Sequence, residues 1–68
     1  MKIIEIEASE KVLGELITLK ISNGTVYVEK ENGSGIIGNY ANKIEVFCKD
    51  RYIPLIDIFP FLKNAEIE

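Results

Sequence analysis

The residues from Gly33 to Gly38 have the spacing G-x-G-x-x-G, which can form a loop around a phosphate group. A dinucleotide-binding loop of this kind opens a helix inside a β-α-β unit. Here Asn39-Tyr40-Ala41-Asn42 follows instead, and a chain of 68 residues is too short for that fold. We therefore interpret residues 33–38 as a flexible or bulged turn, in which glycine permits backbone conformations that other residues avoid.

The chain has one cysteine, no histidine and scattered carboxylates. Without a histidine, Cys48 lacks the usual base that activates a catalytic thiol, and without a second cysteine it forms neither an internal disulfide nor a zinc site. Cys48 follows the two-residue period of Ile44 and Val46, so we expect it in the core. Carboxylate pairs such as Glu5 and Glu7 are typical of the charged outer face of a strand. The sequence thus predicts a protein that is not an enzyme and uses no metal or cofactor.

The charge balance limits the classes of partner. Eight Lys and Arg residues stand against eleven Asp and Glu residues, a net charge of −3, and both signs are scattered along the chain. Proteins that bind a phosphate backbone normally carry a basic stripe, so nucleic acid is disfavoured without being excluded. Acidic residues interrupt the apolar start of the chain, and no apolar stretch is long enough to span a bilayer. We expect a cytoplasmic protein that makes no use of a membrane.

A β-hairpin centred on Asn23-Gly24 is the clearest structural element. Alternating apolar residues flank this dipeptide, which favours a two-residue turn with positive φ at both positions. The turn pairs Ser22 with Thr25 and thereby fixes the register of both strands. The predicted pairs are Ile21 with Val26 and Leu19 with Val28 on the core side, and Lys20 with Tyr27 and Thr18 with Glu29 on the outer side.

Further strands are expected before and after this hairpin. Residues 4–8 alternate between apolar and charged side chains, as a half-buried strand does. Residues 9–16 could form a helical turn capped by Ser9, but Gly14 weakens it, so we expect a turn or bulge leading into the hairpin. Ile36-Ile37 is expected to begin a short third pairing. A strand at residues 44–49 then turns at Asp50-Arg51.

The C-terminal part of the chain is the most apolar. Pro54 indicates the end of a strand or a sheet edge, because proline has no N–H for the ladder. Asp57 is expected to cap a helical turn that has Pro60 in its first turn, where the missing N–H breaks no helical bond. The tail, residues 64–68, is expected to fray or to add a little edge structure.

These elements predict a single domain over residues 1–68. Its fold is mostly β, with a small α+β fold as an alternative. It is a bent antiparallel meander or a small partly open barrel of about five short strands with a short C-terminal helix. A chain this small has little core, and it has neither a disulfide nor a metal to support that core. We therefore expect a homo-oligomer or a complex with another protein.

Large apolar side chains outside the predicted core are the candidate partner-binding residues. Tyr27 and Phe47, together with Tyr40, fall on the predicted outer face. These rings could anchor a protein partner, stack on nucleic-acid bases, or be covered by a curled sheet or the helix. The basic residues beside them in the stacking model are Lys20, Lys43, Lys49 and Arg51.

The apolar segment at residues 53–62 exceeds what one small sheet can cover. We expect Ile58, Phe61 and Leu62 to reach another chain, with simple core packing as the alternative. The predicted function is a non-enzymatic protein-interaction or regulatory module that self-associates. The alternative is a small-barrel protein that binds single-stranded nucleic acid.

Overall fold

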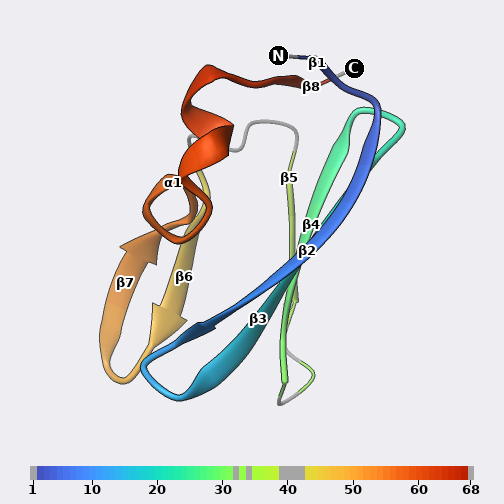
Figure 1. Ribbon diagram of the computed structural model, residues 1–68. Helices are drawn as coiled ribbons and strands as arrows, with labels where there is room; N and C mark the ends of the chain where they lie inside the picture. The colour runs from blue at the N-terminus through green and yellow to red at the C-terminus, as the bar shows by residue number, and fades with distance from the viewer. Residues whose placement is uncertain (1, 32, 34, 39–42, 68) are drawn as a thin grey trace.

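The computed structural model describes residues 2–31, 33, 35–38 and 43–67, and strands dominate these residues (Figure 1). The largest sheet is an antiparallel meander with the strand order β2-β3-β4-β5. Its strands are β2 (Glu5–Val12), β3 (Glu15–Ser22), β4 (Thr25–Lys30) and β5 (Gly35–Gly38). The other strands are the antiparallel hairpin of β6 (Glu45–Cys48) and β7 (Arg51–Pro54), and the parallel pair of β1 (Lys2–Ile3) and β8 (Glu66–Ile67).

The meander and the β6–β7 hairpin are separate arms, and the C-terminal turns follow β7 (Figure 1). These turns are α1 (Leu55–Ile58) and a 3₁₀ turn at Pro60–Asn64. The core is made of the inner faces of both arms and the apolar side of the turns, together with Ile3 of β1 and Ile44 before β6. It comprises Ile3, Ile17, Leu19, Ile21, Val26, Val28, Ile44, Val46, Cys48, Leu55, Ile58, Phe59 and Leu62. The described strands form no closed barrel, and the predicted mostly β fold of antiparallel strands with a short C-terminal helix is confirmed.

The β3–β4 hairpin has the register that its turn sequence predicts. Asn23 and Gly24 have φ values of 51° and 77°, as a two-residue turn of this kind requires. Ser22 lies opposite Thr25, and the core-side and outer-side pairs all match. Ile36-Ile37 belongs to β5, which pairs with β4 and confirms the short third pairing. Gly35–Gly38 is therefore a strand, so the prediction of a turn throughout residues 33–38 is wrong for these four residues.

The predicted turn or bulge at residues 9–16 is much shorter than expected. All residues of β2 pair with β3, and only Leu13-Gly14 forms the turn. Both residues have positive φ, 51° at Leu13 and 85° at Gly14. Gly14, which weakens a helix in this segment, completes a two-residue hairpin turn instead.

The turn between β6 and β7 lies one residue earlier than predicted. Lys49 and Asp50 occupy it, with φ values of 48° and 64°, and Arg51 already belongs to β7. Lys49 is not a typical choice for positive φ, although Asp50 is, so the sequence carries no clear signal for a two-residue turn here. The shift changes the register and places Phe47 opposite Tyr52.

Asp57 is not the N-cap of the C-terminal helical turn. α1 begins after Pro54, which ends β7 as predicted, and Asp57 lies inside α1. The backbone N–H of Leu55 donates to the carbonyl of Ile44 over 2.9 Å, so a tertiary bond takes the place of a side-chain cap. Pro60 opens the following 3₁₀ turn, where its missing N–H costs no bond. The tail contributes β8, in agreement with the predicted edge structure.

Candidate functional site

Phe47 and Tyr52 form an exposed aromatic pair on the outer side of the β6–β7 hairpin, here called the aromatic face. Val46 and Cys48 are fully buried, so the alternation of β6 turns Phe47 outward. Tyr52 lies directly opposite Phe47 on β7. The two ring centroids are 5.0 Å apart with the ring planes tilted by 55°, which is within the range of favourable aromatic contacts.

The aromatic face is open to solvent. Phe47 is 45% exposed and Tyr52 is 67% exposed. Two large rings in contact on the outside of a small sheet differ from single scattered apolar residues, which are normal on protein surfaces. Aromatic rings of this kind are enriched among the residues that contribute most to protein–protein binding. The pair is therefore suited to binding an apolar group of a partner.

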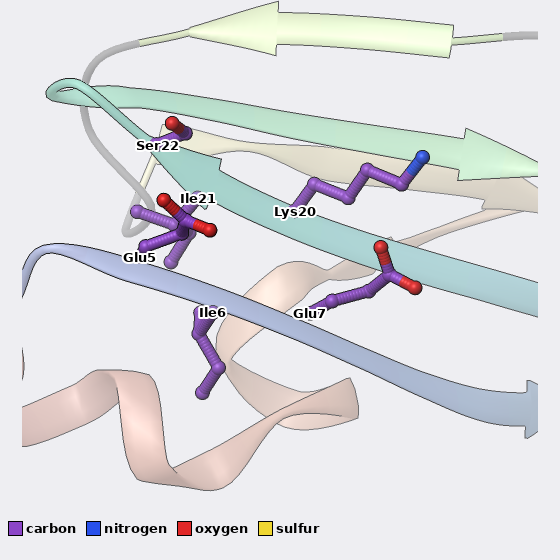
Figure 2. A pocket seen from close by; sticks show the side chains of 6 residues that line it. All are labelled: Glu5, Ile6, Glu7, Lys20, Ile21 and Ser22. Atoms are coloured by element: carbon purple, nitrogen blue, oxygen red, sulfur yellow. The ribbon is translucent and has the colours of Figure 1, made fainter.

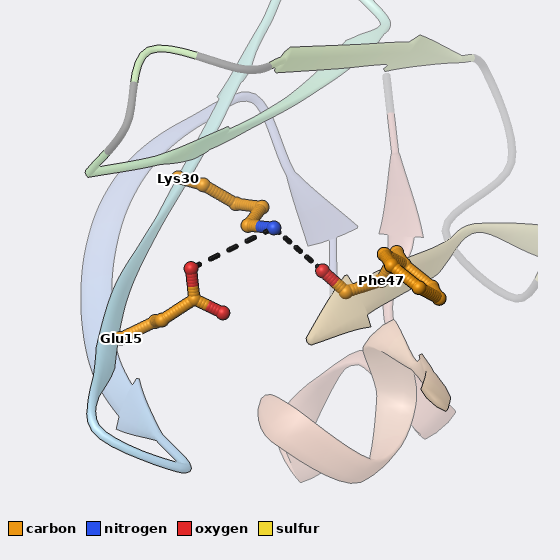
Figure 3. Close-up of polar contacts among 3 residues, drawn as sticks. All are labelled: Glu15, Lys30 and Phe47. Carbon is orange, nitrogen blue, oxygen red and sulfur yellow. Dashed lines mark hydrogen bonds and ion pairs between the residues drawn. The ribbon is translucent and has the colours of Figure 1, made fainter. Parts of the chain in front are cut away.

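A polar contact fixes the β6–β7 hairpin to the meander (Figure 3). The Lys30 ammonium donates a hydrogen bond to the backbone carbonyl of Phe47 over 2.6 Å, and it lies 3.6 Å from a carboxylate oxygen of Glu15. Both charged side chains are mostly buried. Hydrogen bonds from charged donors are stronger than neutral ones, so this contact holds the backbone of Phe47 in place.

Cys48 lies in the core beneath this contact and is not equipped for nucleophilic chemistry. Burial raises the pKa of its thiol, and the nearby Glu15 carboxylate raises that pKa further through its charge and a hydrogen bond. A nucleophilic cysteine needs a lowered pKa and access to solvent. Cys48 has neither, in agreement with the predicted place in the core.

A shallow hollow of about 310 Å³ lies over β2 and β3 (Figure 2). Its lining comprises Glu5, Ile6, Glu7, Lys20, Ile21 and Ser22. Glu7 lies opposite Lys20 in the ladder, and the charged side chains of the hollow are exposed to water. Acid–base catalysis depends on a site that shields such groups, which this hollow does not provide. In the part of the chain that the structure describes, no three His, Cys, Asp or Glu side chains gather closely enough to hold a metal ion.

The predicted partner-binding residues do not share one surface. Phe47 is exposed as expected, but Ile58 and Leu62, at 9% and 5% exposure, belong to the core of the chain. Phe61 is half-buried and makes an edge-on ring contact with Phe59 at 6.2 Å. Of these predicted residues, only Phe47 is exposed.

Tyr27 is half-buried on the outer face of the meander. A Cβ atom built on Gly35 would lie 3.1 Å from the Tyr27 hydroxyl oxygen, so the tyrosine ring reaches across the glycine on the neighbouring strand. Such a ring covers backbone that a glycine leaves bare. Tyr27 therefore supports the sheet edge, while Tyr40 lies outside the described residues.

Sequence reasoning missed Tyr52, Lys30 and Glu15. Tyr52 was missed because its partner across the hairpin depends on the position of the turn. Glu15 and Lys30 could have been found from the alternation of the strands. Glu15 lies on the same strand face as Ile17, and Lys30 lies on the same strand face as Val28. Opposite charges that continue the core phase at one end of a sheet indicate a buried pair, since isolated buried charges are costly.

Comparison with known proteins finds no matching family model, no similar curated protein and no similar solved structure. Among the described residues, no helix has both the length and the apolar character needed to cross a bilayer.

Proposed function

We propose that this protein is a non-enzymatic, cytoplasmic interaction module that binds another protein through the aromatic face. The observation that carries the proposal is the contact between Phe47 and Tyr52, at 45% and 67% exposure, on a hairpin whose other side is part of the core. The two rings offer an apolar anchor, and the Tyr52 hydroxyl offers a hydrogen bond beside it.

The rings are held ready for binding. Val46 and Cys48 fix the inner side of β6, and Lys30 fixes the carbonyl of Phe47. Phe and Tyr each have only two side-chain torsions, so little conformational entropy is lost when a partner covers them. Binding energy is therefore not consumed by ordering the hairpin.

Charged residues of the same hairpin lie next to the rings in the sequence and can form a polar rim. Glu45, Lys49, Asp50 and Arg51 are exposed on the same hairpin and are balanced in sign. Such a rim around an apolar centre is typical of protein interfaces. A balanced rim attracts phosphate groups weakly, which favours a protein partner over single-stranded nucleic acid, the alternative function.

The test compares two substitutions that remove similar exposed apolar groups. Leu13 is 47% exposed and lies in the β2–β3 turn, outside the aromatic face, so Leu13→Ser is the matched control for Phe47→Ser. Proteins captured from a native extract by the immobilised unmodified chain are identified, and each purified candidate is titrated by calorimetry. We expect Phe47→Ser to weaken binding by about tenfold or more, and Leu13→Ser to change it by less than about threefold.

Equal affinities for the Phe47→Ser and Leu13→Ser variants would contradict the aromatic face as the binding site. Titration with a single-stranded oligonucleotide tests the alternative function. Oligonucleotide binding that weakens steeply with salt and is lost in Phe47→Ser would replace the protein partner with nucleic acid.

A further inference from the structure

β2 is an edge strand along its entire length. It occupies one end of the meander order, and all eight of its residues pair with β3 on one side. No other described strand pairs with its second side (Figure 1). The opposite edge strand, β5, has only four residues, with a glycine at each end. Long edge strands present unpaired backbone groups to which another strand can add.

The two-residue turn at Leu13-Gly14 determines which backbone groups face outward. Val12 and Glu15 flank this turn and form a hydrogen-bonded pair, and such pairs alternate along an antiparallel ladder. The N–H and C=O groups of Ala8 therefore point toward β3. Those of Glu7, Ser9 and Lys11 point away from it, and a second strand could use them.

We propose that β2 pairs with β2 of a second copy of this chain, antiparallel and about a two-fold axis through Ser9. The two meanders would then join into one continuous sheet. This proposal goes beyond the proposed function, because it uses the β2 edge rather than the aromatic face.

The charges along β2 select this register. A two-fold axis through Glu7, Glu10 or Lys11 would place that residue opposite its own copy, and like charges directly opposite each other are unfavourable. The charged side chains thus discourage unspecific pairing along the edge. Within the centre of β2, Ala8 and Ser9 remain as axis positions.

The axis through Ser9 gives complementary pairs on both faces of the sheet. Glu7 lies opposite Lys11 of the second copy, and Ile6 lies opposite Val12 of the second copy. The two-fold axis produces each of these pairs twice in the dimer. An axis through Ala8 would instead place Ile6 opposite Glu10. Ile6 and Val12 are only half-buried in the single chain, so the second copy would cover more of their apolar surface.

A proline substitution at the axis tests the pairing without breaking the β2–β3 ladder. Ser9→Pro removes an N–H that faces away from β3, and prolines of this kind are tolerated on edge strands. Ser9→Ala removes the contact of the Ser9 hydroxyl with that of Thr18 but keeps the N–H, so it is the matched control. Mass is measured by light scattering after size exclusion over a dilution series, with circular dichroism as the check on folding. We expect the unmodified chain and Ser9→Ala to reach twice the 7.7 kDa of one chain. Ser9→Pro should stay at the mass of one chain with an unchanged spectrum.

A charge exchange tests the register. Glu7→Lys and Lys11→Glu each place like charges opposite each other, so each variant alone should dimerise at least about tenfold more weakly. An equimolar mixture of the two variants restores both complementary pairs and should form a mixed dimer. A single-chain mass for the unmodified protein at every concentration would overturn the proposal. A dimer that survives Ser9→Pro would also overturn it. If Phe47→Ser abolishes that surviving dimer, the aromatic face forms the dimer interface instead of β2.

Discussion

The β3–β4 and β6–β7 hairpins have the same turn geometry, but only one of them has a recognisable turn sequence. Asn23 and Gly24 form the first turn, Lys49 and Asp50 form the second, and all four residues have positive φ. In the first hairpin, residues that accept this conformation impose the register. In the second, Lys49 gives no such preference, and the burial of Val46 and Cys48 determines only which face of β6 points inward.

The outer faces of the two hairpins also differ. The outer side of β3 and β4 carries charged residues beside the half-buried Tyr27, whereas the outer side of β6 and β7 carries the exposed rings of Phe47 and Tyr52. The β3–β4 hairpin supplies the centre of the meander and much of the core. The β6–β7 hairpin is attached through its inner face and presents an apolar surface outward. The β3–β4 hairpin is therefore part of the scaffold, and the β6–β7 hairpin is the element that this scaffold presents to solvent.

The largest effect is expected from breaking the attachment between these two regions. Lys30→Met removes the hydrogen bond to Phe47 and leaves the mostly buried Glu15 carboxylate without its partner. We expect the free energy of unfolding to fall by roughly 2 kcal/mol, as for other hydrogen bonds to charged groups. Chemical denaturation measures this change, and amide hydrogen exchange should show β6 opening more than β3.

Lys20→Met is the matched control, because Lys20 is exposed on the outer side of the same meander. Its effect should stay within about 0.5 kcal/mol, as for most surface substitutions. Equal losses for the two variants, or exchange that rises equally in β3 and β6, would show that Lys30 does not attach the hairpin.

A smaller effect is expected from exchanging the two turn sequences. The left-handed conformation costs an ordinary residue roughly 1–2 kcal/mol, and Asn and Gly pay much less. Lys49→Asn combined with Asp50→Gly should therefore raise the free energy of unfolding by about 1 kcal/mol. Asn23→Lys combined with Gly24→Asp should lower it by a similar amount. Denaturant melts of both double variants measure the exchange, and two changes of the same sign would contradict a shared turn geometry.

The difference between the turn sequences of the two hairpins also explains how much of the fold was predictable. Asn23-Gly24 combined a local turn preference with alternating strands, so the pairs on both faces of β3 and β4 followed from the sequence. Leu13-Gly14 and Lys49-Asp50 each contain a residue that rarely adopts positive φ; the first turn was predicted too long and the second one residue too late. The helical turn was misread for a related reason, since the tertiary bond from Leu55 to Ile44 replaces the cap expected at Asp57.

The candidate site was predictable only in part. Alternation with Val46 and Cys48 correctly placed Phe47 outside. Tyr52 could not be matched to it, because a two-residue turn at Asp50-Arg51 would place Tyr52 opposite Lys49 instead of Phe47. Apolar content gave no way to separate Ile58 and Leu62, which complete the core, from residues that reach a partner, since both kinds of residue are apolar.

The smallest effect concerns pH and tests whether the two regions stay closed over Cys48. Burial and the Glu15 carboxylate raise the pKa of this thiol in the folded chain. In the unfolded chain the thiol loses its proton near its ordinary pKa of about 8.5. Below that pH the thiol is protonated in both the folded and the unfolded chain, so it does not change the free energy of unfolding. Above that pH the unfolded chain releases the proton first, and the free energy of unfolding falls until the pKa of the folded chain is passed. Comparing the unmodified chain with Cys48→Ala at pH 7 and about pH 9.5 isolates this group from others that titrate there. We expect the difference in free energy of unfolding between the two proteins to narrow as pH rises. A constant difference would mean that Cys48 is not shielded between the meander and the hairpin.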